Sequence, residues 1–216
     1  MDPRARYEKE IQTTRHNRTR HIIEAAERVF TIKGIENTTM QDVAREANLG
    51  VATVFRFFPR KDKLIVAVVT SNLQQVLHAF QSIAAMSVSC LDKIELLFDH
   101  SISLLHNQDS SNVKLMENFE NYAAHYTEPL EDIEAFNAVY REISSVFSSV
   151  ITQGVQDGSI RPDLPIPETL TTVMNTFSMF ARKLSLQKNI LLFEQDVPPE
   201  NQLAILKQIL MSYLRN

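Results

Sequence analysis

The sequence predicts an all-α protein with a smaller N-terminal part and a larger C-terminal part. Its 216 residues include only 4 glycines and 8 prolines and no tryptophan, which leaves few turn residues for an architecture of many strands. Apolar residues recur at three- and four-residue spacing along most of the chain, as they do on the buried faces of amphipathic helices. The composition, 44% hydrophobic and 22% charged, is that of a globular protein with a hydrophobic core.

The first clear helical pattern ends at Lys33 and Gly34, where a basic last turn meets the residue best suited to end a helix. Its apolar face comprises Ile22, Ala26, Val29 and Phe30. A second, short helix begins at Thr39, because Asp42 follows in the spacing of a capping box.

A tight turn over residues 48–50 follows the second helix. Asn48 can adopt a left-handed backbone conformation, and Gly50 can serve as the N-cap of a third short helix over residues 51–58, which Pro59 ends. A fourth helix begins near Lys61 and continues without glycine or proline to about residue 85. Further amphipathic patterns predict helices around 94–105, 115–122, 131–157, 167–187 and 199–215, with a loop over 158–165.

Charge is divided unevenly along the chain. Residues 1–64 hold 13 lysines and arginines against 9 acidic residues, whereas residues 65–216 hold 9 against 17. A basic N-terminal part on an acidic remainder indicates that the N-terminal part meets a polyanion, although small imbalances are also common on solvated surfaces.

Several function classes lack their characteristic residues. Cys90 has no partner for a disulfide or a structural zinc site, and the histidines do not stand at metal-ligand spacing. The chain has no glycine-rich phosphate loop and no nucleophile elbow. No apolar run reaches the length of a membrane span, and residues 1–4 do not begin a signal peptide. We therefore expect a cytoplasmic protein that is not an enzyme and needs neither metal nor cofactor.

Three short helices with a tight turn between the second and third are the layout of a helix-turn-helix, whose third helix presents its outward side chains to the DNA major groove. We expect Val54 and Phe58 to hold this third helix against the first two. The candidate DNA-contacting residues are then Thr39, Gln41, Gly50, Val51, Ala52, Thr53, Phe55, Arg56, Phe57 and Lys61.

Each side chain type suits a particular DNA contact. Arg56 can read guanine or bind a phosphate, while Val51 and Ala52 can touch thymine methyl groups. Thr53 can donate a hydrogen bond to a phosphate, and Lys61, at the start of the fourth helix, can bind one from the flank. Gln41 and Thr39, at the start of the second helix, are candidates for a base and a phosphate contact, respectively.

Residues 38–64, TTMQDVAREANLGVATVFRFFPRKDKL, resemble the DNA-binding signature of the tetracycline-repressor (TetR) family of bacterial transcription regulators. The resemblance covers about residues 18–64, and the loop over residues 157–163 resembles one often found before the penultimate helix of these proteins. It implies an all-helical chain that dimerises through its C-terminal helices. It also implies that a small molecule bound in the C-terminal domain releases the protein from its operator.

The chain departs from the family pattern at several positions. Asn48 stands where glycine is usual, and Gly50 stands where a serine or threonine usually caps the helix. Phe55 and Phe57 replace the more common tyrosine or histidine, so Thr53 and Lys61 must supply more of the phosphate contacts.

The first 17 residues form a longer segment before the helix-turn-helix than is usual in the family. They could reach along DNA as an arm, but two glutamates interrupt their basic run, so we expect a solvated, disordered tail. The basic and acidic residues concerned are Arg4, Arg6, Glu8, Lys9, Glu10, Arg15 and His16.

Aromatic and methionine side chains of the C-terminal part stand at core spacing, and most of them are expected to be core residues. A wide helical bundle lined by such residues can also enclose an apolar ligand. The candidate ligand-binding residues are Phe98, Ile102, Met116, Phe119, Tyr122, Tyr140, Phe147, Met174 and Phe177.

We therefore expect a DNA-binding domain over residues 1–64 and an effector-binding and dimerisation domain over residues 65–216. The protein is expected to be a ligand-released repressor that binds a palindromic double-stranded operator as a homodimer, with an apolar or amphipathic effector. The last two helices are expected to form the dimer through stripes comprising Phe177, Phe180, Ala181 and Leu184, and Leu203, Leu206, Leu210 and Tyr213. Two alternatives stay open at this point: a helical carrier or enzyme without DNA function, and a DNA-binding protein without an effector.

Overall fold

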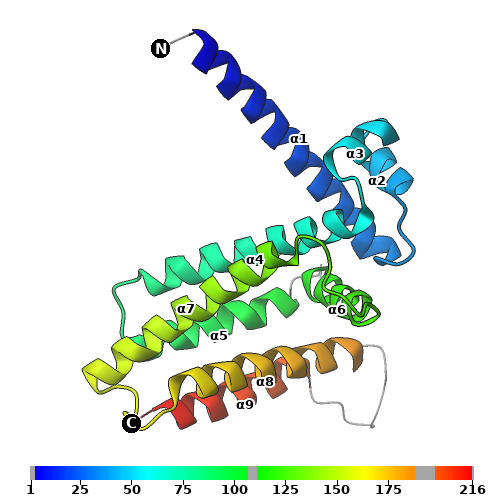
Figure 1. Cartoon of the computed structure of the whole chain (residues 1–216). Helices are drawn as coiled ribbons and strands as arrows, with labels where there is room; N and C mark the ends of the chain where they lie inside the picture. Colours follow the sequence, from blue (N-terminus) through cyan, green and yellow to red (C-terminus); the bar gives the residue numbers. More distant parts are fainter. Residues whose placement is uncertain (1–2, 107–110, 188–197, 216) are drawn as a thin grey trace. The chain divides into compact units, whose positions relative to one another are not determined.

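The computed structural model describes residues 3–106, 111–187 and 198–215, and its regular elements within these ranges are nine α-helices (Figure 1). The all-α prediction is therefore confirmed. The helices are α1 (Pro3–Lys33), α2 (Met40–Glu46), α3 (Val51–Phe57), α4 (Lys61–Ala84), α5 (Cys90–His106), α6 (Ser111–Ala124), α7 (Ile133–Asp157), α8 (Ile166–Gln187) and α9 (Pro199–Leu214).

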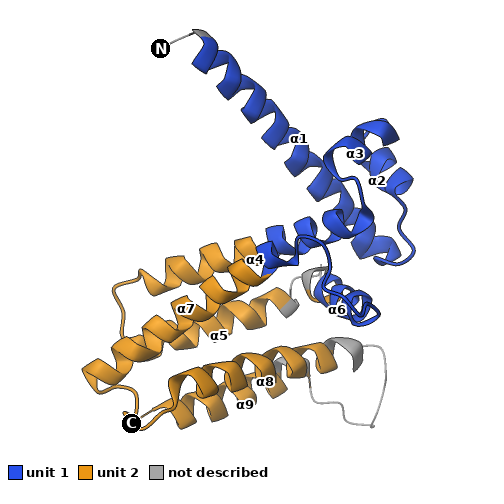
Figure 2. Ribbon diagram, in the orientation of Figure 1, with its two compact units in different colours: residues 1–72, 115–136 blue, residues 73–114, 137–216 orange. Residues whose placement is uncertain are grey.

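The chain divides into two compact units (Figure 2). Unit 1 comprises residues 1–72 and 115–136, and unit 2 comprises residues 73–114 and 137–216. Helix α4 contributes to both units, because the division falls between Asn72 and Leu73. The functional division after residue 64 stays a prediction, and the packing adds residues 115–136 to the N-terminal unit.

Helix α1 begins at Pro3, so the expectation of a disordered N-terminal tail is wrong. After Pro3 the helix contains neither glycine nor proline, and proline is well tolerated in a first helical turn. The hydroxyls of Thr13 and Thr19 donate to the carbonyls four residues earlier, so these side chains do not break the helix. The helix ends as predicted, at Gly34, which has a φ of +80°.

The core of unit 1 joins the helix-turn-helix to the segment 115–136. Ile22 and Phe30 of α1, Val54 of α3 and Leu64 of α4 are fully buried in one cluster. Leu115 and Phe119 of α6 complete the same cluster, and the ring of Phe119 lies 5.2 Å from that of Phe136. Residues 115–136 therefore belong to the core that supports the first three helices.

The core of unit 2 is formed by α5, α7, α8 and α9, together with the C-terminal part of α4. Its central aromatic cluster is Phe98, Phe147 and Phe177, with ring centroids 5.9 Å apart for Phe98 and Phe147 and 5.4 Å apart for Phe98 and Phe177. The loop after α7 is fixed to the end of α9, because Ile160 pairs with Arg215 in an isolated β-bridge.

None of the helices in the described ranges is both long and apolar enough to cross a membrane.

Candidate nucleic-acid interface

Helix α3 is held in unit 1 by the two side chains that the sequence predicted. Val54 is fully buried and Phe58 is 7% exposed, and both lie in the unit 1 core. The side chains of Ala52, Phe55 and Arg56 are consequently exposed, while those of Val51, Thr53 and Phe57 are partly buried. The structure thus leaves one face of α3 available to a partner.

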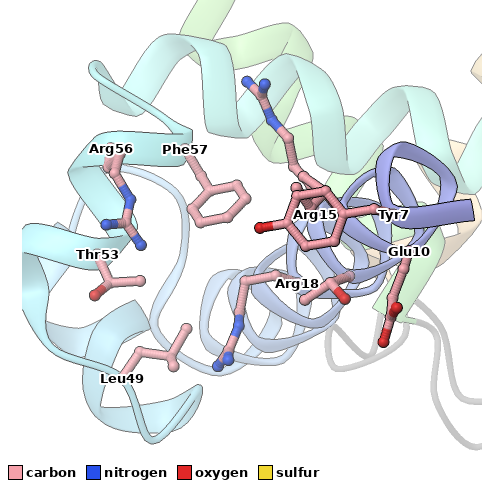
Figure 3. A pocket seen from close by; sticks show the side chains of 10 residues that line it. Tyr7, Glu10, Arg15, Arg18, Leu49, Thr53, Arg56 and Phe57 are labelled. Atoms are coloured by element: carbon pink, nitrogen blue, oxygen red, sulfur yellow. The ribbon is translucent and has the colours of Figure 1, made fainter. Parts of the chain in front are cut away.

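An open groove of about 630 Å³ lies between α3 and the N-terminal half of α1 (Figure 3). On the α3 side, Thr53, Arg56 and Phe57 line it, and the guanidinium carbon of Arg56 lies 5.8 Å from the centre of the Phe57 ring. The remaining lining residues are Leu49 and, from α1, Tyr7, Glu10, Ile11, Thr14, Arg15 and Arg18.

The turn between α2 and α3 has the predicted geometry. Asn48 adopts a φ of +52°, in the left-handed region that asparagine tolerates. Gly50 is the N-cap of α3 and provides no side-chain hydrogen bond. The turn is fixed to α1, because the Nε2 atom of His21 lies 2.8 Å from the carbonyl oxygen of Ala47.

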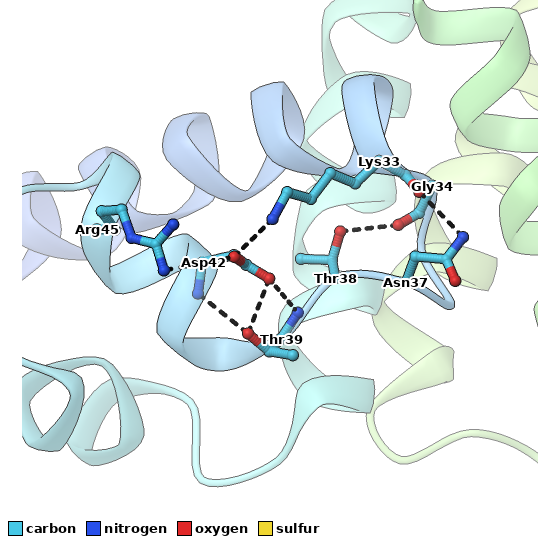
Figure 4. Close-up of polar contacts among 7 residues, drawn as sticks. All are labelled: Lys33, Gly34, Asn37, Thr38, Thr39, Asp42 and Arg45. Carbon is cyan, nitrogen blue, oxygen red and sulfur yellow. Dashed lines mark hydrogen bonds and ion pairs between the residues drawn. The ribbon is translucent and has the colours of Figure 1, made fainter.

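The start of α2 carries the predicted capping box (Figure 4). The backbone N–H of Asp42 donates to the Thr39 hydroxyl, which donates in turn to the Asp42 carboxylate at 2.8 Å. Lys33 donates to the same carboxylate at 2.6 Å and, with the Thr39 contacts, holds the pKa of Asp42 well below its usual range. The Thr39 hydroxyl is therefore engaged in the cap, whereas Gln41 is exposed beside it.

Lys61 is the first residue of α4 and packs against the loop before α2. Its Nζ atom donates to the carbonyl of Glu36 at 3.1 Å, and burial lowers the pKa of its amine. This contact fixes Lys61 at the helix N-terminus, where the backbone N–H groups already favour an anion. All ten candidate DNA-contacting residues lie in unit 1.

A buried carboxylate beside Lys61 was not recognised from the sequence. Asp62 is 7% exposed, and it accepts hydrogen bonds of 2.6 Å from the Tyr122 hydroxyl and from Arg60. Burial alone would raise the pKa of Asp62, but these hydrogen bonds outweigh it and hold the pKa below its ordinary value. Burial and the contact with Asp62 raise the pKa of Tyr122, whose hydroxyl also lies 2.6 Å from that of Tyr126.

The acidic residues before α7 extend this cluster. Glu131 lies 2.8 Å from the Nζ atom of Lys63 and 3.6 Å from Arg60, and Asp132 lies 3.3 Å from Lys63. No spacing in the sequence indicates these contacts with the start of α4. The segment 115–136 is thus tied by polar contacts to the residues that directly follow the helix-turn-helix.

The nine candidate ligand-binding residues are divided between the two units. Met116, Phe119 and Tyr122 lie in unit 1 and pack with its core. The other six lie in unit 2, where Met174 approaches Ser144 and Tyr140 is 40% exposed. Those that contact the unit 2 core are Phe98, Ile102, Phe147, Met174 and Phe177.

The predicted dimer stripes of α8 and α9 are largely used within unit 2. Phe177, Ala181, Leu184 and Leu203 are buried in its core, and Phe180, Leu206 and Leu210 are partly buried against it. Large apolar side chains exposed on the two helices are Met179 (71% exposed), Ile205 (55%), Ile209 (60%) and Tyr213 (47%). Ile205, Ile209 and Tyr213 stand four residues apart, so they share one face of α9.

Residues 22–68 match the family model described as bacterial regulatory proteins of the tetR family. Among characterised proteins, the chain is 24% identical over 153 residues to the HTH-type transcriptional repressor KstR2 of Mycolicibacterium smegmatis, covering 69% of this chain and 71% of that protein. It is 22% identical over 166 residues to the fatty acid metabolism regulator protein of Bacillus subtilis, covering 71% and 82%.

Solved structures share the fold of this chain. The transcriptional regulator FadR from Bacillus subtilis, in complex with stearoyl-CoA, gives a TM-score of 0.70 at 15% identity and covers 90% of this chain and 98% of that one. A TetR transcription regulator from Haloarcula marismortui gives a TM-score of 0.71 at 18% identity and covers 92% and 97%.

Proposed function

Because this chain belongs to the TetR family of DNA-binding transcription regulators, we propose that it is a homodimeric repressor that leaves a palindromic operator when it binds a small apolar or amphipathic effector. The observation that carries the proposal is the exposed face of α3, which Val54 and Phe58 hold in place within the part of the chain that matches the family.

The proposed DNA contacts are assigned to side chains of α2, α3 and the start of α4 according to how exposed each one is. Ala52 and Phe55 of α3 and Gln41 of α2 are exposed and face bases, where an amide can read adenine and an apolar group can touch a thymine methyl. Arg56 and Lys61 bind phosphates on either side of these contacts. Replacing Gln41 with alanine should therefore change base preference, while replacing Lys61 should weaken binding to all sequences and reduce its salt dependence.

The proposed dimer forms through the exposed face of α8 and α9. Met179, Ile205 and Ile209 supply an apolar surface that unit 2 does not use, and Tyr213, whose ring packs against Arg161, extends it. Two such pairs of helices can form a four-helix bundle. A dimer with two-fold symmetry would present its recognition helices to successive major grooves, about 34–36 Å apart, which is why the operator is expected to be a palindrome.

The proposed effector site lies in unit 2, around the aromatic cluster of Phe98, Phe147 and Phe177. These side chains, with Met174 beside them, offer apolar and adaptable packing for a ligand. The names of similar proteins support an apolar or amphipathic ligand: one solved relative is in complex with stearoyl-CoA, and another is named a ketosteroid transcriptional regulator.

The proposed switch acts through α4, which contributes residues to both units and contains neither glycine nor proline. For a hundredfold loss of operator affinity, the effector must favour the DNA-incompetent state by about 2.7 kcal/mol. An insertion of two glycines after Gln74 should leave ligand binding and DNA binding intact but weaken their coupling. Undiminished release of DNA by the effector in the insertion variant would rule out α4 as the sole connection.

The decisive experiment is a binding assay with fragments of the gene neighbourhood, titrated with salt. A specific complex whose affinity falls steeply with salt supports the proposal. If no fragment is bound in low salt, the chain is not a DNA-binding repressor, and a helical carrier or enzyme becomes the better interpretation. A thermal-shift screen with fatty acyl and sterol compounds then tests the effector, because a ligand that binds the folded state raises the melting temperature.

A further inference from the structure

The N-terminal half of α1 carries cations that no acidic group within the described residues neutralises. Arg6, Lys9, Arg15 and Arg18 are exposed and form no ion pair with any residue that the structure describes. In contrast, Arg20 pairs with Glu24 at 3.7 Å on the opposite side of the helix from Arg18.

The helix-turn-helix itself has little net positive charge. Residues 21–64 hold 7 basic and 6 acidic residues, whereas residues 1–20 hold 6 basic and 3 acidic ones. Five of the seven cations in residues 21–64 form ion pairs: Arg28, Lys33, Arg45, Arg60 and Lys63. Most of the basic excess that can attract DNA therefore resides in the N-terminal half of α1.

One face of this half-helix is directed toward α3. Tyr7, Ile11, Thr14, Arg15 and Arg18 recur at three- and four-residue spacing, and all of them line the groove shared with Thr53 and Arg56 (Figure 3). The same face continues at Ile22, which is fully buried in the core of unit 1. The buried stripe that holds α1 in the fold therefore continues past the core as an exposed, basic stripe beside the recognition helix.

We propose that the groove between the N-terminal half of α1 and α3 binds the sugar-phosphate backbone of double-stranded DNA. The inference rests on the proposed DNA-binding function and extends it to the N-terminal extension of α1. Arg15 and Arg18 on one wall and Arg56 on the other supply guanidinium groups, which bind phosphate through planar, charge-assisted hydrogen bonds. The hydroxyls of Tyr7, Thr14 and Thr53 can donate to further phosphate oxygens.

The dimensions of the groove suit a nucleic-acid strand. Tyr7 and Arg18 are eleven residues apart, which is about 16 Å along a helix. A strand of B-DNA carries one phosphate for about every 3.4 Å of its axis, so several phosphates can lie along the groove. Glu10 is the acidic side chain in the lining, against the three arginines, so the groove keeps a net positive charge.

The first test compares the double variant Arg15→Gln/Arg18→Gln with the single variant Arg20→Gln. Affinity for an operator fragment is measured by fluorescence anisotropy over a series of salt concentrations. The logarithm of the binding constant falls with the logarithm of the salt concentration, and each phosphate contact contributes about −0.9 to this slope. The slope of the double variant should therefore be less steep by nearly 2 for each protomer. Its affinity at low salt should fall on the order of tenfold or more, while Arg20→Gln, on the opposite face of α1, should match the wild type.

The second test locates the DNA directly. Cys90 is buried, so a cysteine introduced at an exposed position can be labelled selectively with a photo-crosslinker. Thr14→Cys places the label in the groove, and Gln12→Cys places it on the opposite face of the same helix. We expect crosslinks to the DNA backbone from Thr14→Cys and far fewer from Gln12→Cys.

The outcomes separate this inference from the proposed function. If the wild-type protein binds an operator and Lys61→Ala weakens binding, but the double variant keeps the wild-type affinity and slope, the groove does not bind DNA. Equal crosslinking from Gln12→Cys and Thr14→Cys would also overturn it, and a protein–protein crosslink from Thr14→Cys would assign the groove to a second copy of the chain. If the wild type binds no DNA, the proposed function itself fails. The substituted side chains of α1 are exposed and Lys61 is partly buried, so the variants of α1 are expected to fold, and circular dichroism can verify the fold of every variant.

Discussion

Replacement of Tyr122 with phenylalanine tests the connection between the segment 115–136 and the start of α4. The change removes one hydroxyl, which donates to the buried carboxylate of Asp62 at 2.6 Å, and keeps the ring. Asp62 then retains its hydrogen bond from Arg60 and a smaller contribution from the Tyr126 hydroxyl. Since a hydrogen bond to a charged group contributes about 1.5–3 kcal/mol, we expect the free energy of unfolding to fall by about 2 kcal/mol. For a chain of this length that corresponds to a melting temperature lower by about 4–8 °C.

The matched control is Tyr126→Phe. The Tyr126 hydroxyl lies 2.6 Å from that of Tyr122, but the residue is 43% exposed, so water can replace the lost contact. Its removal should cost well under 1 kcal/mol. The hydroxyl of Tyr126 is also the smallest of the hydrogen-bond contributions to the low pKa of Asp62, so equal losses in the two variants would refute the larger role assigned to Tyr122.

The pH dependence of this loss has a definite sign. The folded state lowers the pKa of Asp62 below its ordinary value of 3.8, so the carboxylate stabilises the fold above that value and loses this contribution as the pH falls through the folded pKa. The difference in stability between wild type and Tyr122→Phe should therefore be largest near neutral pH and shrink below about pH 4. Urea denaturation at several pH values measures it, and a difference that is constant with pH would refute the role assigned to the Asp62 charge.

Three other contacts, at Gly154, Thr39 and Ile209, can each be tested by one substitution. Gly154→Ala should lower the free energy of unfolding by about 1–3 kcal/mol, because the added Cβ would overlap the buried Ile160, and thermal denaturation can measure this. Thr39→Ala should destabilise the fold by about 1 kcal/mol through loss of the capping contacts with Asp42, and a variant with unchanged stability would show that the cap is dispensable. Ile209→Glu should convert a dimer into monomers in light scattering, because it places a charge on the proposed α9 interface, and an unchanged dimer mass would move that interface elsewhere.

The parts of the fold that could be predicted from the sequence are those that local chemistry determines. Gly34 predicts the C-terminal end of α1, and the capping box at Thr39 predicts the N-terminal end of α2. The turn between α2 and α3 follows from the tolerance of Asn48 for a positive φ. The roles of Val54 and Phe58 follow from their four-residue spacing. Each of these signals lies within a few residues of the feature that it determines.

The features that were not predicted depend on contacts between distant segments. Asp62 and Tyr122 are sixty residues apart, so no spacing in the sequence indicates that they meet. The division of the candidate ligand-binding residues has the same origin, because core spacing does not reveal which core a helix joins. The helical N-terminal extension has a different origin. Its interrupted charge does not prevent a helix, because residues 4–20 contain no helix-breaking residue.

The chain crosses between the two units at three points, after residues 72, 114 and 136. The first crossing lies within α4, and the other two flank the segment whose Tyr122 binds Asp62, the residue next to Lys61. A ligand at the proposed site in unit 2 would therefore have two routes to the start of α4, one along α4 itself and one through the segment 115–136. Glycines inserted after Gln74 interrupt only the first route, and Tyr122→Phe weakens only the second. If each change alone leaves part of the coupling between effector and DNA, and the combined variant loses all of it, both routes transmit the effect of the ligand. If the insertion alone abolishes the coupling, the contact of Tyr122 with Asp62 contributes to stability and not to regulation.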